Sequence, residues 1–268
     1  MKTSSHTKQS AWAPIVIGLL SLLAVWQLIV TLTGVPKFIL PPPATVLSTF
    51  IDRFGLLSRH ALITGIEIVA GLFLGSVIGI ASAIMLTLMS SARRWALPLM
   101  VISQSLPVFA LAPLLTLWFG YGMGSKIVMA TLIIYFPVTA ATFDGLRHTR
   151  PAMLDLARTM NASSFAVLRH IRLPAALPSI SSGIRVATSV APIGAIVGEW
   201  VGSSQGLGFL MLQANGRMQT DMMFAALFFL CIMAYSLYCL VSYVLDRALY
   251  WQSDSSIATH AVITTRNS

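Results

Sequence analysis

Two glutamates lie inside long apolar stretches and are the first candidates for chemistry. Glu67 falls within residues 61–88, and Glu199 falls within residues 183–202. An ionisable side chain inside an apolar span is costly unless it is paired or wet, so it marks a functional site by default. Together with Gln104, we interpret the two glutamates as candidates to line a solute path. The competing interpretation is structural, with each carboxylate satisfied by neighbouring Ser, Thr or Trp side chains.

Other arrangements that carry chemistry are missing from the sequence. No Gly-x-x-x-x-Gly-Lys-Ser/Thr phosphate loop occurs, because the glycines at 202–208 lack the lysine. The histidines are scattered, so they form no Ser/His/Asp set or metal cluster. Cys231 and Cys239 lie about 12 Å apart along one predicted helix, too far for a disulfide. We expect no catalytic residue, metal or cofactor in this chain, and any ATP to be bound by another subunit.

The composition is that of a membrane protein. Hydrophobic residues make up 56% of the 268 residues and charged residues only 9%, with a mean hydropathy of +0.82. A soluble domain carries about 25% charged residues, because its surface is wet. A net charge of +9 would suggest a nucleic-acid partner in a soluble chain. In a membrane chain an excess of Lys and Arg marks the cytoplasmic loops, so we expect membrane lipid around the protein and no nucleic acid.

Six stretches are apolar enough to cross a hydrocarbon core about 30 Å thick, which needs about 20 residues per helix. They are residues 12–33, 61–88, 97–119, 126–143, 183–202 and 222–245. With both termini inside, twelve basic residues fall in inside segments and five outside, which accounts for all 17. The predicted fold is therefore an all-α integral membrane protein with six transmembrane helices, N-in and C-in. The first stretch is longer than the apolar core of a signal peptide, so we interpret it as an uncleaved span.

Proline and glycine positions suggest how the chain is divided. The three prolines at 41–43 cannot continue a helix, and residues 44–57 then show helical spacing typical of a periplasmic surface helix. Gly71, Gly75, Gly79 and Ala83 recur every four residues, which lets helix backbones approach closely. We expect an N-terminal tail and first helix, a Pro-rich periplasmic loop, a membrane domain and a disordered cytoplasmic tail, at residues 1–35, 36–60, 61–250 and 251–268.

The loop at 144–182, between the fourth and fifth spans, predicts two short cytosolic helices. Pro151 suits a first helical turn, so a helix is expected over 151–160, and Asn161 can adopt the left-handed conformation that ends it. Ser163 is a plausible N-cap for a second helix over residues 162–171. Leu173-Pro174 and Leu177-Pro178 are expected to break the helical pattern before the fifth span. Phe165 and Leu168 are three residues apart and are expected to share one apolar face.

This loop resembles the EAA loop of bacterial binding-protein-dependent importers. Asp155, Leu156 and Ala157 occupy the Glu-Ala-Ala positions, Asn161 the glycine position, and Leu173-Pro174 the closing pair. The resemblance implies a coupling helix that docks into a groove on a separate ATPase subunit, a helix-in-groove mode of recognition. The sequence departs from the pattern in three ways. Asp155 is shorter than glutamate, Leu156 is bulkier than alanine, and Asn161 makes the turn at some conformational cost.

Three further motifs resemble the nitrate, sulfonate and taurine branch of these permeases. They are Leu40-Pro41-Pro42-Pro43, the stretch from Ala112-Pro113-Leu114 to Trp118-Phe119-Gly120-Tyr121-Gly122, and Glu199 followed by Gly206-Leu207-Gly208. The resemblance covers roughly residues 36–250 and makes 61–250 the transport permease domain. It implies a multi-pass protein of the bacterial inner membrane, a homodimer, two ABC ATPase subunits, and a periplasmic or lipid-anchored solute-binding protein.

The substrate is less determined than the class. The tract from Glu199-Trp200 to Asn215-Gly216-Arg217-Met218-Gln219-Thr220 resembles permeases for hydroxymethylpyrimidine-like thiamine precursors, and a sulfonate, taurine or nitrate is the alternative. A secondary transporter is one rival, although such proteins usually show internal repeats, which this sequence lacks. An intramembrane enzyme is the other rival, and it would need converging polar residues inside the bilayer.

Overall fold

The structure is a computed structural model that describes residues 12–89 and 107–250. Within these ranges every regular element is helical, which confirms the predicted all-α class. The helices in chain order are α1 Trp12–Thr33, α2 Pro43–Asp52, α3 Phe54–Leu88, α5 Val108–Phe119, α6 Met123–Arg147, α7 Pro151–Thr159, α8 Ser164–Val167, the π-helical turn η1 Leu168–Arg172, α9 Leu173–Gly202, α10 Leu207–Gly216 and α11 Thr220–Ala248.

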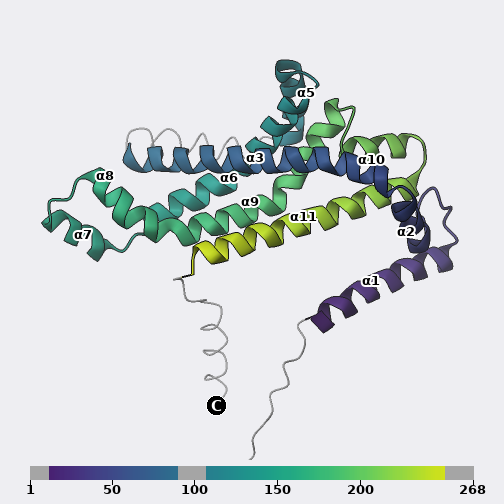
Figure 1. Ribbon diagram of the computed structural model, residues 1–268, viewed down its shortest axis with the longest axis horizontal. Helices are drawn as coiled ribbons and strands as arrows, with labels where there is room; N and C mark the ends of the chain where they lie inside the picture. Colours follow the sequence, from purple (N-terminus) through teal and green to yellow (C-terminus); the bar gives the residue numbers. More distant parts are fainter. Residues whose placement is uncertain (1–11, 90–106, 251–268) are drawn as a thin grey trace, which may run out of the picture.

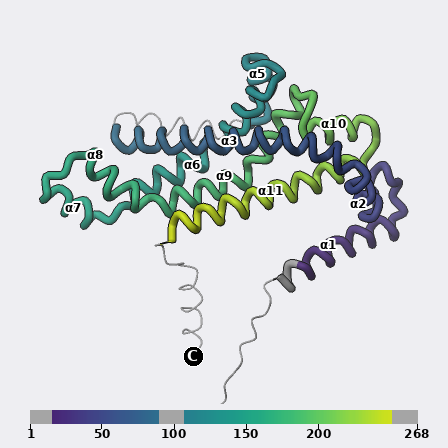
Figure 2. Tube along the Cα trace, viewed as in Figure 1, coloured from purple at the N-terminus to yellow at the C-terminus, as the bar shows by residue number. Residues whose placement is uncertain are grey.

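The core of the protein is a bundle in which α6 packs between α3 and α9 (Figure 1). Buried apolar residues from the three helices form its middle layer, among them Ile68, Leu72, Ile134, Val138, Ala187 and Ala191. The long helix α11 lies along the outside of this bundle, and α5 and α10 lie towards one end of it. At the opposite end α7 and α8 project from the bundle. The helix α1 extends away from it, which Figure 2 also shows.

Small residues allow the three central helices to approach closely. A Cβ atom added at Gly71 would lie 2.5 Å from the Ala130 Cβ, and one added at Gly194 would lie 2.7 Å from the Ala130 Cα. Contacts under about 3 Å are not tolerated, so α3 and α9 both press against the same residue of α6. The predicted packing role of the four-residue glycine repeat in α3 is confirmed, because Gly75 and Gly79 also face α6 at under about 3.4 Å.

Five helices are long and apolar enough to span a membrane within the described ranges. They are Val16–Thr33, Phe54–Leu88, Met123–Arg147, the continuous helix Ser164–Gly202, and Thr220–Ala248. They contain five of the six predicted spans, with the second and fifth longer than expected. The remaining predicted span, 97–119, is described only from residue 107 and there forms the 12-residue α5. The surface helix expected over 44–57 ends at Asp52, because residues from Phe54 onwards already belong to α3.

The expected break before the fifth span was wrong. Leu173-Pro174 and Leu177-Pro178 do not break the helix, since α9 runs without interruption from Leu173 to Gly202. Pro174 occupies the first turn of α9, directly after the wider turn η1, and proline is tolerated where a helical N–H is not needed. The segment that follows α9 contains α10, for which the sequence analysis gave no prediction. Its ten residues begin after Gly206 and are mostly apolar, a helical signal that the glycines obscured.

Candidate functional site

The segment 151–172 folds as two short helices joined by a tight turn, and we call it the α7–α8 hairpin. The helix α7 starts at Pro151 and ends in a closing backbone bond from the Ala162 N–H to the Ala157 carbonyl, 3.0 Å long. Asn161 has φ 54°, so the predicted left-handed turn is confirmed. The Ser163 hydroxyl accepts the Ala166 N–H at 3.2 Å, which confirms the predicted N-cap of α8.

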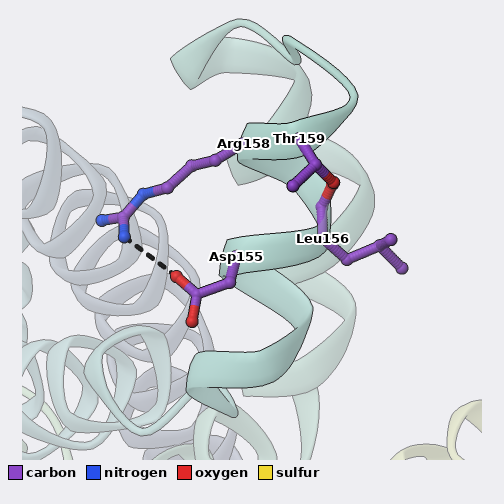
Figure 3. Close-up of polar contacts among 4 residues, drawn as sticks. All are labelled: Asp155, Leu156, Arg158 and Thr159. Atoms are coloured by element: carbon purple, nitrogen blue, oxygen red, sulfur yellow. Dashed lines mark hydrogen bonds and ion pairs between the residues drawn. The ribbon is translucent and has the colours of Figure 1, made fainter.

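Asp155 lies on the opposite side of α7 from Leu156 (Figure 3). Its carboxylate accepts a hydrogen bond from Arg158 Nη1 at 3.0 Å, one turn further along the same helix. Both side chains are largely exposed, so the ion pair contributes well under about 1 kcal/mol to stability. Leu156 points away from this pair, and Thr159 donates to its carbonyl oxygen at 2.7 Å. The hairpin therefore has one charged face and one apolar face.

The apolar face of α7 is formed by Met153, Leu156 and Met160, which recur at helical spacing. Leu156 is 63% exposed and Met160 is 73% exposed. Together with Ala157 and Pro174 they line an open apolar groove of about 600 Å³, whose facing wall is formed by α8, η1 and the start of α9. Phe165 of α8 is also exposed. This concentration of apolar surface on one small hairpin is typical of a protein–protein contact.

Leu168 does not belong to this exposed surface, so the prediction that it shares a docking face with Phe165 was wrong. Leu168 is 4% exposed and packs against Leu146, Ala176 and Ile180 in the interior of the bundle. The reason is tertiary packing: the side of α8 and η1 that carries Leu168 lies against α6 and α9, whereas Phe165 lies outside that contact. Ala157 is likewise buried and Leu173 half-buried, whereas Asp155, Asn161 and Pro174 reach the surface.

A second polar site lies at the other end of the bundle, around Glu199. We define the Glu199 cluster as Glu199, Thr64, His60 and the backbone of Gly206–Gly208. Thr64 donates to Glu199 Oε1 at 2.6 Å, and the Gly208 N–H donates to Oε2 at 2.5 Å. The Leu207 N–H donates to the Thr64 hydroxyl at 2.8 Å, and the Gly206 N–H donates to His60 Nδ1 at 3.0 Å. A carboxylate and its partners thus satisfy the first free N–H groups of α10.

Glu67 and Lys126 lie beside the Glu199 cluster. The Glu67 carboxyl group lies within hydrogen-bonding reach of the Glu199 carboxyl group. Lys126 is fully buried, and its ammonium donates to the carbonyl oxygens of Tyr121 at 2.7 Å, Gly122 at 3.0 Å and Gly202. It joins the loop before α6 to the end of α9 and places a positive charge near both carboxyl groups.

The structure brings together two of the three residues predicted for the solute path. Glu67 and Glu199 are neighbours, yet each is only 1% exposed in the chain. Neither carboxyl group is presented to a solute in this conformation, and their contacts hold α3, α9 and α10 together. Their role in the path stays a prediction, and Gln104 lies outside the described residues. Sequence reasoning missed Lys126, although a lysine inside an apolar helix is as costly as a glutamate.

Replacing Glu199 by glutamine tests whether this cluster matters for transport. The amide nitrogen cannot accept a hydrogen bond, so either the Thr64 hydroxyl or the Gly208 N–H loses its acceptor. An unsatisfied buried donor costs about 1–3 kcal/mol. We expect solute uptake to fall roughly ten-fold while the permease still assembles with its partners. Glu67→Gln is the matched control. It should reduce uptake less than Glu199→Gln does, since Glu67 Oε2 accepts no hydrogen bond within the described part of the chain.

Several apolar helices long enough to cross a membrane define the class, a multi-pass membrane protein. The chain matches the family described as "Binding-protein-dependent transport system inner membrane component" over residues 71–250. It is 52% identical over 236 residues to a probable ABC transporter permease protein of Haemophilus influenzae, covering 88% of this chain and 96% of that protein. The chain therefore belongs to the family of binding-protein-dependent transport system inner membrane components.

Two further comparisons extend this result. The chain is 35% identical over 215 residues to the formylaminopyrimidine transport permease protein ThiX of Halalkalibacterium halodurans, covering 80% of this chain and 86% of ThiX. The solved MetNI methionine ABC transporter has the same fold, with a TM-score of 0.65 at 21% identity, covering 73% of this chain and 97% of the matched chain. The resemblance to permeases of the nitrate, sulfonate and taurine branch is confirmed. The relatives are permeases, which are transporters and not enzymes.

Proposed function

We propose that this protein forms the solute pathway of an ATP-driven importer and is driven by a separate ATPase that docks on the α7–α8 hairpin. The observation that carries the proposal is the exposed apolar surface of Leu156, Met160 and Phe165 on a hairpin that projects from one end of the bundle (Figure 1). If the hairpin lies in the cytosol, as the distribution of basic residues favours, this patch meets water, and an exposed apolar patch in water favours a protein partner. A short helix laid into a groove is a common mode of such docking.

The connection between the hairpin and the bundle supports the same proposal. The helix α8 continues through η1 into α9, so Ser164–Gly202 is one helix of 39 residues. The part of this helix from Gly183 onwards packs closely on α6, where Gly183 approaches Ala141 and Gly194 approaches Ala130. We therefore expect a displacement of the hairpin to be transmitted along this continuous helix to its contacts with α6. A secondary transporter, the rival function, has no evident use for an apolar hairpin joined to a span in this way.

The assembly that we propose is a homodimer with two ABC ATPase subunits and a periplasmic or lipid-anchored solute-binding protein. The proposed setting is the bacterial inner membrane, with six spans and both termini in the cytoplasm. ATP is bound by the ATPase subunits, and this chain needs no cofactor. The domain boundaries proposed above place the permease domain at 61–250, which the family match over 71–250 supports. Alternating access between the two protomers would pass the solute without making or breaking a bond in it.

The proposed substrate is a small pyrimidine related to a thiamine precursor. The support is the 35% identity to ThiX, whose name specifies formylaminopyrimidine transport. A sulfonate, taurine or nitrate is the second candidate, supported by relatives named for sulfonate and taurine transport. The test is uptake by proteoliposomes that contain the permease, its ATPase and its binding protein, with ATP present or absent. Uptake that follows an ion gradient without ATP would favour a secondary transporter and contradict the proposal.

The orientation can be tested by cysteine labelling. In a background in which Cys231 and Cys239 are serine, a membrane-impermeant thiol reagent added to intact cells should label cysteines introduced at Met123 and Gly216. A cysteine at Arg150 should be labelled only after the cells are opened. The twelve-to-five distribution of basic residues is the physical reason. Labelling of position 150 in intact cells would place the α7–α8 hairpin outside, where no ATPase can reach it.

A further inference from the structure

Two carboxyl groups, those of Glu67 and Glu199, lie together in the interior of the bundle where α3 packs on α9. Thr64 and Glu67 are three residues apart on α3 and share a face of that helix, and Thr64 donates directly to Glu199. Glu67 therefore lies within hydrogen-bonding reach of Glu199, and both side chains are buried. Two carboxyl oxygens at this separation need a proton between them, so the two groups are not both ionised.

The donors around Glu199 identify it as the ionised member of the pair. Its Oε1 accepts from Thr64 at 2.6 Å and its Oε2 from the Gly208 N–H at 2.5 Å. The Phe209 N–H faces the same carboxylate. Both N–H groups belong to the first turn of α10, where a negative charge is favoured. A carboxyl group bonded by three donors is stabilised as the anion.

Glu67 has the opposite surroundings. Its Oε2 atom is buried and accepts no hydrogen bond within the described ranges. Lys126 places a positive charge nearby, but its three ammonium N–H groups donate to the carbonyl oxygens of Tyr121, Gly122 and Gly202. No N–H group of Lys126 is left for Glu67. A buried carboxylate without a donor is costly, whereas the neutral acid needs only an acceptor for its O–H.

The charges at this site balance when Glu67 is neutral. Lys126 carries one positive charge, and an ionised Glu199 carries one negative charge close to it. His60 is the remaining titratable member of the Glu199 cluster, and its Nδ1 accepts the Gly206 N–H, so its ring is neutral. A second ionised carboxyl group would leave an uncompensated negative charge among apolar helices.

We propose that Glu67 is a neutral carboxylic acid that donates its proton to the Glu199 carboxylate. Glu67 is then a positioning residue, because it acts through Glu199 and adds a fourth donor to that carboxylate. An O–H group that donates to a carboxylate makes a short hydrogen bond, about twice as strong as one between neutral groups. The proton makes the pair attractive, and its loss would make the pair repulsive. One proton thus holds α3 against the end of α9 and the start of α10.

The sequence allows a direct test, because Glu67 and Glu199 are its only glutamates. Full-length permease is synthesised in a cell-free system with glutamate that carries a heavy carbon isotope in its side-chain carboxyl group. Its infrared spectrum at neutral pH is subtracted from that of the unlabelled protein, so that only these two groups contribute. We expect one signal from a protonated carboxylic acid, which shifts in heavy water, and one from a carboxylate. Two carboxylate signals and no acid signal would overturn the proposal.

Two variants assign the proton and its role. Glu67→Gln should lose the acid signal and keep the carboxylate signal, and an acid signal that survives would place the proton on Glu199. The glutamine amide still donates an N–H, so this variant should unfold near the temperature of the original protein. Glu67→Met has a similar length and no donor, and it should unfold at a lower temperature. A higher temperature for Glu67→Met would show that the two carboxyl groups repel each other, and equal temperatures for the two variants would show that no donated hydrogen bond is lost; either result contradicts the proposal.

Discussion

The double variant Leu156→Ala/Phe165→Ala should lose its ATPase while remaining in the membrane at its normal level. Both side chains are more than 60% exposed on the α7–α8 hairpin, so their removal opens no cavity in the permease. Truncation of a central apolar anchor at an interface costs about 2 kcal/mol or more, and two of them should reduce binding several hundred-fold. The measurement is co-purification of the ATPase with tagged permease, together with ATP-driven uptake.

Two variants separate docking from folding. Leu168→Ala removes a buried side chain and should destabilise the permease by about 2–5 kcal/mol, which lowers its membrane level. Asn161→Val should impair assembly for another reason, because a β-branched residue adopts the observed φ of 54° poorly. If the Leu156/Phe165 variant keeps its ATPase and full ATP-driven uptake, the hairpin is not the coupling element and the proposed function loses its main support.

Gly206→Ala should destabilise the end of the bundle around Glu199 more than alanine at any other glycine of the chain destabilises its surroundings. Gly206 has φ 107°, a conformation that L side chains rarely adopt, and an added Cβ would lie 2.2 Å from the Glu199 Cδ. The strain costs about 1–3 kcal/mol and the overpacking about 1–3 kcal/mol more. The Glu199 carboxylate cannot move aside without losing Thr64 and Gly208. We expect a large drop in the temperature at which the purified permease loses its gel-filtration peak.

Gly216→Ala is the matched control at the other end of α10. No atom lies within 4 Å of a Cβ at that position, and its φ is not positive. Alanine there should leave the unfolding temperature unchanged or raise it slightly, since alanine is the better helix former by about 1 kcal/mol. If both variants unfold at the same temperature, the Glu199 cluster contributes little to the position of α10. Glu199→Gln would then be expected to leave uptake unchanged as well.

Features that depend on neighbouring residues in the chain could be predicted from the sequence. Apolar runs of the length of a membrane predict the spans, and their helical backbone follows because every N–H and C=O must be satisfied internally. Both ends of α7 and the start of α8 could also be predicted, since Pro151 and Asn161 act through their own backbone geometry and Ser163 through its hydroxyl group. The glycine repeat of α3 predicted close packing because its spacing places four small residues on one helix face.

Features that depend on contacts across the fold required the structure. Leu168 and Phe165 look equivalent at a spacing of three residues, and only the packing of Leu168 on Leu146 and Ile180 buries one while the other stays exposed. Glu199 and Thr64 are 135 residues apart, so no local pattern predicts their hydrogen bond or the anchoring of α10. A local signal states what a segment prefers by itself, whereas burial and pairing depend on which distant segment lies against it.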